Sequence, residues 1–264
     1  MKSFRKLSLM ITFIAVSFSS FAWWGQTGHR VVGEIADSYL TSKARKAILE
    51  ILGTESIAMS SNWADFIKSD STYNYLSPWH YINVKQGLTQ TEFNGFLQND
   101  TITDAYTKLN FLIAELKNKQ LSPEKKQMYL RLLIHIVGDI HQPLHVGRLE
   151  DLGGNRIRVL WFGDSTNLHS VWDEKLIGSQ NLSYTEYAKA INHATKTQRQ
   201  QWQAQPMNEW FFESYQLAGK IYSGITQPYQ RLSFRYNFDY IEMLNSQLLK
   251  GGIRLAGLLN SIFA

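Results

Sequence analysis

The most constraining feature of the chain is an almost wholly apolar stretch, residues 128–140, that carries one His and one Asp. Ser122 and Pro123 precede it, and a Ser N-cap followed by Pro in the first turn is a common helix start. A helix that is apolar on nearly all sides is expected at the centre of a domain. His135 and Asp139 are four residues apart, so they share one face of this helix. Burial of an ionised Asp without a partner is costly, and a metal ion would remove that cost.

The rest of the chain also has a mainly helical pattern. Residues 156–162 suggest a strand and follow a Gly-Gly-Asn turn at 153–155. The sequence contains no repeat, low-complexity tract or linker, and its length suits one domain. It therefore predicts a single compact domain of the all-α (mainly α) class. Apolar residues recur at helical spacing in residues 30–40, 42–52, 104–116, 184–195, 209–222 and 240–259.

The first 22 residues have the layout of a secretory signal peptide. Three basic residues among the first six precede an apolar run, and small residues end at Ala22. We therefore predict that residues 1–22 are removed and that residues 23–264 form the mature domain, secreted or periplasmic and without a membrane anchor. Removal takes away three basic residues and no acidic residue, so the formal net charge falls from +5 to +2. The chain has no cysteine, which excludes disulfides, a thiolate nucleophile and cysteine-bound zinc.

A second His and Asp pair repeats the spacing of four. His169 and Asp173 form this pair, and an imidazole nitrogen and a carboxylate oxygen one turn apart can bind the same zinc ion. Because Pro143 disfavours a helix in the residue before it, His145 is expected to leave the axis of the first helix. The two pairs favour a metal centre over isolated, hydrogen-bonded histidines. His193 lies in a polar segment and is interpreted as a surface residue.

Six ordered motifs together resemble one family. The chain is similar to the zinc-dependent single-strand-specific nucleases of the S-one and P-one type, which are related in fold to bacterial zinc-dependent phospholipase C. The resemblance spans the mature chain and implies a helical domain with a short β-hairpin. The motifs are WGQTGH at residues 24–29, WAD at 63–65, WHYIN at 79–83, HIVGDIHQPLH at 135–145, GGN at 153–155 and NLHSVWD at 167–173.

The resemblance implies three zinc ions with ligands at the matching positions. His141 is not a ligand in the family pattern, and we expect it to orient one through a hydrogen bond. The family's zinc-binding terminal Trp corresponds to Trp24, whereas the small-residue rule favours cleavage after Ala22, which would leave one extra residue. The first ion would be bound by Asp65, His80, His135 and Asp139, the second by His145, His169 and Asp173, and the third by His29, Asp139 and the amine and carbonyl of Trp24.

The resemblance also implies an activity. It implies hydrolysis of single-stranded DNA and RNA to 5′-phosphate products and of 3′-nucleotides, with attack by a hydroxide shared between two zinc ions. Asp65 and Asp139 would be catalytic through these ions, and Lys68 stands where the family commonly has an arginine that contacts phosphoryl oxygens. A lysine keeps the charge but lacks the planar fork. We expect a monomer.

Three further residues are candidates for substrate binding. Tyr81 stands where the family has an aromatic that stacks on a base, and stacking favours single strands because their bases are free. Asn83 stands where several relatives have an aspartate that contacts the base, and Asn155 belongs to the Gly-Gly-Asn turn. Wall packing is the alternative for Tyr81 and Asn83, and a solvated surface position is the alternative for Lys68.

Two other functions remain open at the level of sequence. A zinc-dependent phospholipase C shares the metal arrangement, but it has Glu where Asp173 stands. A non-catalytic zinc-binding protein would use the same ligands without phosphodiesterase activity. The complete ligand pattern, including Asp139 as a bridge, favours the nuclease.

Overall fold

The computed structural model describes residues 25–263 of the 264-residue chain. The predicted signal peptide and the candidate ligand Trp24 lie outside the described residues. The strands are β1 (Arg158–Trp161), β2 (Asp164–Asn167) and β3 (Gln230–Leu232). The helices are α1 (Gln26–Ser38), α2 (Ser42–Leu52), α3 (Ile57–Ser60), α4 (Trp63–Phe66), α5 (Gln90–Gln98), α6 (Ala105–Leu116), α7 (Pro123–Asp139), α8 (Leu168–Ser170), α9 (Leu176–Gly178), α10 (Tyr184–Ile191), α11 (Lys196–Ala204), α12 (Met207–Ser223) and α13 (Phe234–Phe263).

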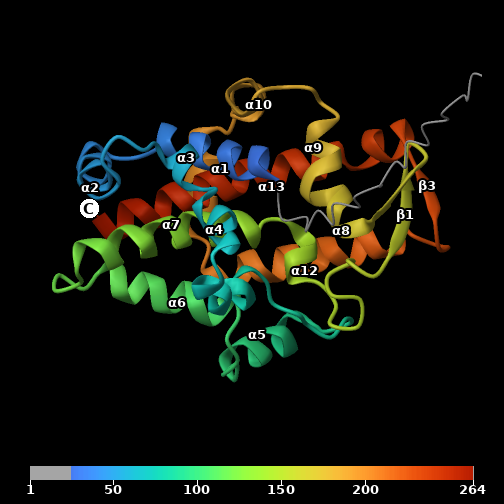
Figure 1. Ribbon diagram of the computed structural model, residues 1–264, viewed down its shortest axis with the longest axis horizontal. Coiled ribbons are helices and arrows are strands. Elements are labelled where there is room, and N and C mark those ends of the chain that lie inside the picture. Colours follow the sequence, from blue (N-terminus) through green and yellow to red (C-terminus); the bar gives the residue numbers. More distant parts are fainter. Residues whose placement is uncertain (1–24, 264) are drawn as a thin grey trace, which may run out of the picture.

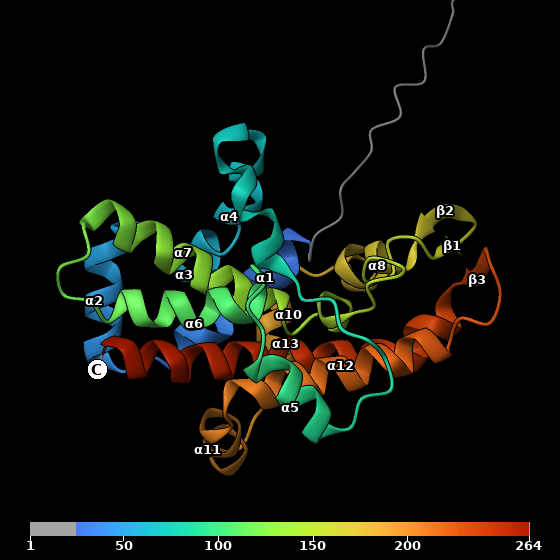
Figure 2. The same ribbon diagram turned by 90° about the horizontal axis from the view of Figure 1, so that it is seen from below.

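The central helix is α7, as its apolar sequence predicts. The Ser122 hydroxyl accepts a hydrogen bond from the Lys125 amide, and Pro123 occupies the first turn. Helices α1, α6 and α13 all pack against α7, which explains why it is apolar on nearly every side. Helix α13 runs along most of the molecule, and the small sheet lies at the end opposite the C-terminus (Figures 1 and 2). The predicted mainly α-helical fold is confirmed.

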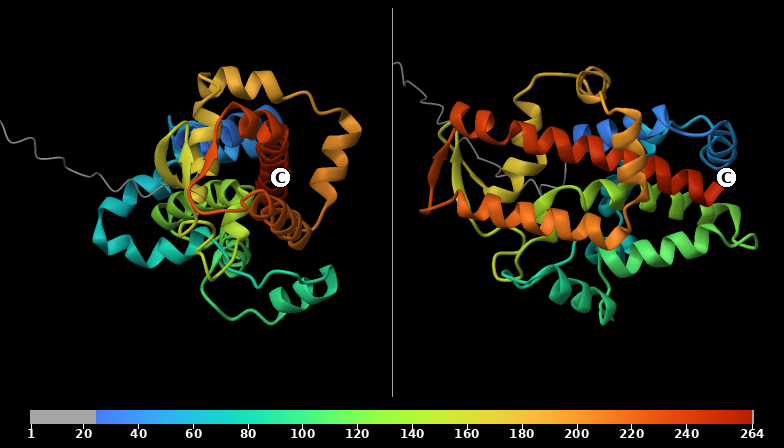
Figure 3. Two further views of the ribbon diagram at one scale, coloured as in Figure 1. Left: turned by 90° about the vertical axis from the view of Figure 1, so that its right-hand side faces the viewer. Right: turned by 180° about the vertical axis from the view of Figure 1, so that it is seen from behind.

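The sheet has three strands, one more than the hairpin expected from the sequence. Strands β1 and β2 form the expected antiparallel hairpin, whose tip has positive φ at Phe162 and Gly163. Strand β3 adds to the free edge of β1 in parallel, with Val159 opposite Gln230. The sequence did not predict β3, because three residues without clear alternation become a strand only through this long-range pairing. Figure 3 shows β3 where the chain passes from α12 to α13.

Two helix boundaries also differ from the prediction. The helix expected over residues 184–195 ends at Ile191, and Thr195 caps a new helix, α11. The helix expected over residues 240–259 is part of the longer α13. Among the helices formed by residues 25–263, none has both the length and the apolar character needed to cross a bilayer.

Short non-α turns carry several candidate site residues. The 3-10 segment Ser71–His80 ends at His80. The 3-10 turn Pro143–Val146 contains His145. A π-helical turn, Val171–Lys175, contains Asp173. Because such turns aim side chains differently from a regular helix, they are frequent at functional sites.

Candidate metal centre

The C-terminal turn of α7 supplies two of the candidate ligands. The His135 Nε2 atom lies 3.1 Å from Asp139 Oδ2, and both side chains are fully buried. Asp139 is the last residue of α7, where the helix dipole already carries partial negative charge. A buried carboxylate at that position therefore requires nearby positive charge.

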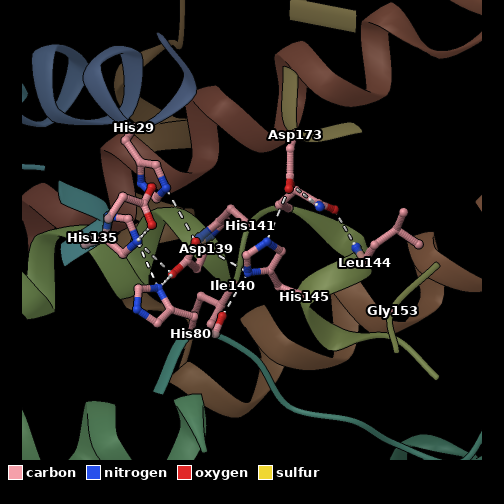
Figure 4. A network of polar contacts seen from close by, with 12 residues as sticks. His29, His80, His135, Asp139, Ile140, His141, Leu144, His145, Gly153 and Asp173 are labelled. Atoms are coloured by element: carbon pink, nitrogen blue, oxygen red, sulfur yellow. Dashed lines mark hydrogen bonds and ion pairs between the residues drawn. The ribbon is translucent and has the colours of Figure 1, made fainter. Parts of the chain in front are cut away.

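Two further histidines meet Asp139 from distant parts of the chain. His80 Nδ1 lies 2.8 Å from Asp139 Oδ2, and His29 Nε2 lies 3.4 Å from Asp139 Oδ1. The His29 and His135 rings are stacked, with centroids 3.8 Å apart. Asp65 approaches from α4, with Oδ1 3.6 Å from His135 Nε2. Figure 4 shows these histidines around Asp139.

A further group, formed by His145, His169 and Asp173, lies next to the residues around Asp139. His145 Nε2 is 3.5 Å from Asp173 Oδ1, and His169 Nε2 is 3.1 Å from Asp173 Oδ2. Helix α7 ends at Asp139, and His145 follows on the 3-10 turn Pro143–Val146, so the predicted departure of His145 from the α7 axis is confirmed. His145 Nδ1 also lies 3.4 Å from Asp139 Oδ1, which places the two groups side by side.

Backbone carbonyls fix the orientation of three rings. His135 Nδ1 donates to the Ser61 carbonyl at 2.6 Å, His145 Nδ1 to the His80 carbonyl at 2.8 Å, and His169 Nδ1 to the Gly153 carbonyl at 2.7 Å. Since a carbonyl only accepts, Nδ1 carries the proton in each ring. The Nε2 atom is then the one able to bind a metal, which is the usual arrangement of metal-binding histidines.

Burial and the neighbouring carboxylates shift the pKa values of the histidines in opposite directions. Burial alone would lower the pKa of His145, but Asp139 and Asp173 raise it to about 9. Burial lowers the pKa of His80 to about 3, which leaves its ring neutral at pH 7. Burial also opposes ionisation of Asp139, yet His135 and His145 hold its pKa well below the usual range. The carboxylates are thus ionised and attract cations.

The donor set fits bound metal ions. Within residues 25–263, Asp139 Oδ1 and Asp173 Oδ2 are buried oxygens that receive no hydrogen bond. Such oxygens are costly to bury unless a cation or water contacts them. Histidine nitrogen and carboxylate oxygen, without sulfur, are common zinc ligands. Three groups have potential ligand atoms within 4.8 Å of one another: His29, Asp65 and His135; His80, His135 and Asp139; and His145, His169 and Asp173.

Lys68 forms an ion pair with Asp65, one of the candidate ligands around Asp139. Its Nζ donates to Asp65 Oδ1 at 2.5 Å, and its side chain is 21% exposed. Burial lowers the pKa of the Lys68 ammonium, whereas the neighbouring Asp65 opposes that change. The half-buried ion pair places a positive charge beside the candidate metal ligands, which argues against a freely solvated surface lysine.

The candidate substrate residues differ in their surroundings. Tyr81 and Asn83 are half-buried and alternate with buried Ile82 and Val84 along an extended segment. Ile82 N–H donates to the His145 carbonyl, so this segment lies directly beside the second group. The alternation directs Tyr81 and Asn83 away from the core. Asn155, in the Gly-Gly-Asn turn, is exposed, and its side-chain Nδ2 donates to the Leu152 carbonyl.

His141 does not have the role expected from sequence. Its Nδ1 donates to the Val137 carbonyl at 2.7 Å, and its Nε2 accepts from Arg254 Nη1 at 3.0 Å. The ring therefore points into a buried network between α7, α12 and α13 instead of toward a ligand side chain. His141 bonds to helix backbone two residues before Asp139, so it acts on the end of α7.

Two residues with roles at this centre were missed by sequence reasoning. Gln142 donates to Asp173 Oδ1 at 2.6 Å and accepts from the Leu144 amide, so it orients a candidate ligand. Gly138 lies against His29, where an added Cβ would be 2.7 Å from Nδ1. Only their positions inside the 135–145 motif could have drawn attention to them.

The comparisons with known proteins all point to nucleases. The sequence model of the S1/P1 nuclease family matches residues 24–264. Endonuclease 3 of Arabidopsis thaliana is 30% identical in an alignment that covers 91% of this chain and 89% of that protein. Nuclease S1 of Aspergillus oryzae is 32% identical over 189 residues, 66% of this chain and 63% of that protein. Nuclease P1 of Penicillium citrinum is 27% identical over 269 residues, 90% and 97% of the two chains.

The fold and the site thus define a helical hydrolase with histidine and aspartate groups able to bind metal ions. The chain belongs to the S1/P1 nuclease family, as the motif pattern predicted. It is a nuclease, and its substrates are nucleic acids.

Proposed function

We propose that the protein is an exported, zinc-dependent endonuclease and 3′-nucleotidase that cleaves single-stranded DNA and RNA to 5′-phosphate products. The observation that carries this proposal is the convergence of three histidine and aspartate groups on the end of α7. A donor set of imidazole and carboxylate without thiolate suits zinc.

Each zinc ion has a proposed ligand set. Asp65, His80, His135 and Asp139 would bind the first ion, and His145, His169 and Asp173 the second. His29, Asp139 and the terminal amine of Trp24 would bind the third. The described part of the chain begins next to this centre, since the Gly25 N–H donates to the Asp173 carbonyl at 2.7 Å.

The chain's own groups would bind and orient the substrate. Bound zinc supplies a Lewis acid for phosphoryl oxygens and lowers the pKa of water. Lys68, paired with Asp65, would donate from its ammonium to a phosphoryl oxygen of the substrate. Tyr81 would stack on an unpaired base, and Asn83 would hydrogen-bond to it. A base within a duplex is already stacked, so this arrangement favours single strands.

A comparison of substrates tests the proposed function. The mature protein, with zinc, is incubated with a single-stranded oligonucleotide, the same sequence as a duplex, a 3′-nucleotide and phosphatidylcholine vesicles. We expect rapid cleavage of the single strand with 5′-phosphate ends, phosphate release from the 3′-nucleotide, and no lipid hydrolysis. Preferred cleavage of the duplex or products with 3′-phosphate ends would overturn the proposal, and lipid hydrolysis would support the phospholipase alternative.

A further inference from the structure

A cavity rich in arginine lies outside the metal centre. Its volume is about 410 Å³, and it lies between β1 and the C-terminal end of α12. Figures 1 and 2 show this end of α12 next to the sheet. Arg148, Arg156 and Arg158 line it, together with Tyr222 and the segment 225–229. No acidic residue is among the lining residues.

The three arginines lack a directly paired carboxylate in the described residues, and Asp151 contacts the cavity wall through the Tyr222 hydroxyl at 3.1 Å. Within residues 25–263, none of Arg148, Arg156 and Arg158 forms an ion pair with a carboxylate. The Arg148 Nε atom is buried and has no hydrogen-bond partner in this part of the chain. Guanidinium groups prefer planar, bidentate contacts with phosphate or carboxylate oxygens. The cavity is therefore complementary to an anion.

The walls of the cavity are held in place before any ligand binds. The Arg148 guanidinium lies 4.0 Å above the Tyr222 ring, and Arg156 Nη1 donates to the Glu150 carbonyl at 3.0 Å. In the segment that forms another wall, Gln230 Oε1 accepts from the Thr226 N–H at 2.8 Å, which fixes the loop from Thr226 to Gln230. Preorganised walls reduce the entropy cost of binding a ligand.

The cavity and the metal centre share one loop. Gly153 N–H donates to the Arg148 carbonyl at 2.9 Å, and the Gly153 carbonyl accepts from His169 Nδ1 at 2.7 Å. Gly153 has φ of +62°, and a Cβ there would overlap the Leu144 carbonyl. Glycine is therefore required at this position of the loop. Figure 4 shows Gly153 beside Leu144 and His145. A nucleic-acid strand bound at the metal centre would reach the arginines by crossing this loop.

We propose that this cavity is an accessory phosphate-binding site for a backbone phosphate of the nucleic-acid strand, away from the bond that is cleaved. The inference rests on the proposed action on single strands. The formal charge of the mature chain is only +2, so attraction for a long strand must come from local clusters such as this one. The site would increase affinity for long strands and leave short substrates unaffected.

The test uses the double variant Arg156→Gln/Arg158→Gln. Both side chains are exposed, so their replacement removes charge without opening the core. Arg231→Gln is the matched control, because Arg231 is an exposed arginine on the neighbouring strand β3 that does not line the cavity. KM and kcat are measured for a single strand of about 20 nucleotides, a length that exceeds one binding module, and for a dinucleotide. Binding of a phosphorothioate strand of the same length is measured by fluorescence anisotropy.

We expect KM of the double variant for the long strand to rise about tenfold, the equivalent of one lost charge-assisted hydrogen bond. Its kcat and its KM for the dinucleotide should stay unchanged, as should all values of the control. The salt dependence of binding should weaken by about 0.7 in log–log slope for each lost phosphate contact. An equal KM for the long strand in double variant and wild type, or an equal rise for both substrates, overturns the accessory site.

The two proposals fail in different ways. A wild type that binds the long strand without cleaving it, with weaker binding in the double variant, rejects the proposed function but supports the accessory site. A wild type that cleaves while the double variant behaves like Arg231→Gln rejects the accessory site alone. A wild type that neither binds nor cleaves single strands overturns both.

Discussion

The buried Arg254 offers the most quantitative prediction of stability. Its side chain is 1% exposed, and its guanidinium contacts His141 Nε2 at 3.0 Å, Gln205 Oε1 at 2.7 Å and Glu213 Oε2 at 2.8 Å. Arg254 on α13 therefore connects α12 to the turn that follows Asp139. The variant Arg254→Met keeps much of the apolar stem but removes every one of these polar contacts.

The size of the effect follows from what each partner retains. Removal of one member of a buried ion pair costs about 3–5 kcal/mol. Glu213 remains 26% exposed and keeps its ion pair with Lys250, so the lower end applies. We expect the free energy of unfolding to fall by about 3 kcal/mol. For a domain of this size, that corresponds to a decrease in Tm of about 6–12 °C.

The assay is urea unfolding at pH 7 with the same fixed zinc concentration for all variants, because metal binding itself adds stability. Arg235→Met is the matched control, since Arg235 is 80% exposed and pairs with Asp239 at 2.9 Å on the helix surface. Exposed pairs of this kind contribute less than about 1 kcal/mol. Equal losses in Arg254→Met and Arg235→Met would refute the reasoning.

Three other changes have defined outcomes. Gly138→Ala should displace His29, whose Nδ1 would lie 2.7 Å from the new Cβ; zinc content should fall by one ion per chain, and full occupancy would contradict this. Gln142→Leu removes the donor to Asp173 and should lower zinc affinity or activity about 10- to 100-fold; an unchanged zinc titration would count against that role. Burial opposes ionisation of Glu213, but its two basic partners lower its pKa below 4.5. The difference in free energy of unfolding between wild type and Glu213→Gln should therefore be constant above about pH 5 and shrink as the pH falls through the lowered pKa. A difference that stays the same at every pH would contradict this.

The helical fold and the two ligand pairs could be predicted because they depend on local pattern. The spacing of four in His135 and Asp139, on an apolar helix, requires only the period of the α-helix and the cost of a buried charge. The meeting of His29, Asp65 and His80 with that helix depends on long-range packing. Only the resemblance of ordered motifs to a known family indicated it.

Other features were invisible for physical reasons. Strand β3 exists only through its pairing with β1, and the arginine cavity forms only where that sheet meets α12. Gln142 is a residue type found mostly at surfaces, and its burial depends on the turn that also carries His145. His141 was expected to face a ligand, but its partner Arg254 lies 113 residues away and could not be identified from spacing.

The zinc content of the mature protein, measured together with its activity, tests the central claim most directly. The protein with Trp24 as its first residue is analysed by inductively coupled plasma mass spectrometry, stripped with a chelator and titrated with zinc while single-stranded DNA cleavage is followed. We predict three zinc ions per chain, loss of cleavage on removal and recovery as zinc returns. Undiminished cleavage by protein that contains almost no zinc would contradict the account.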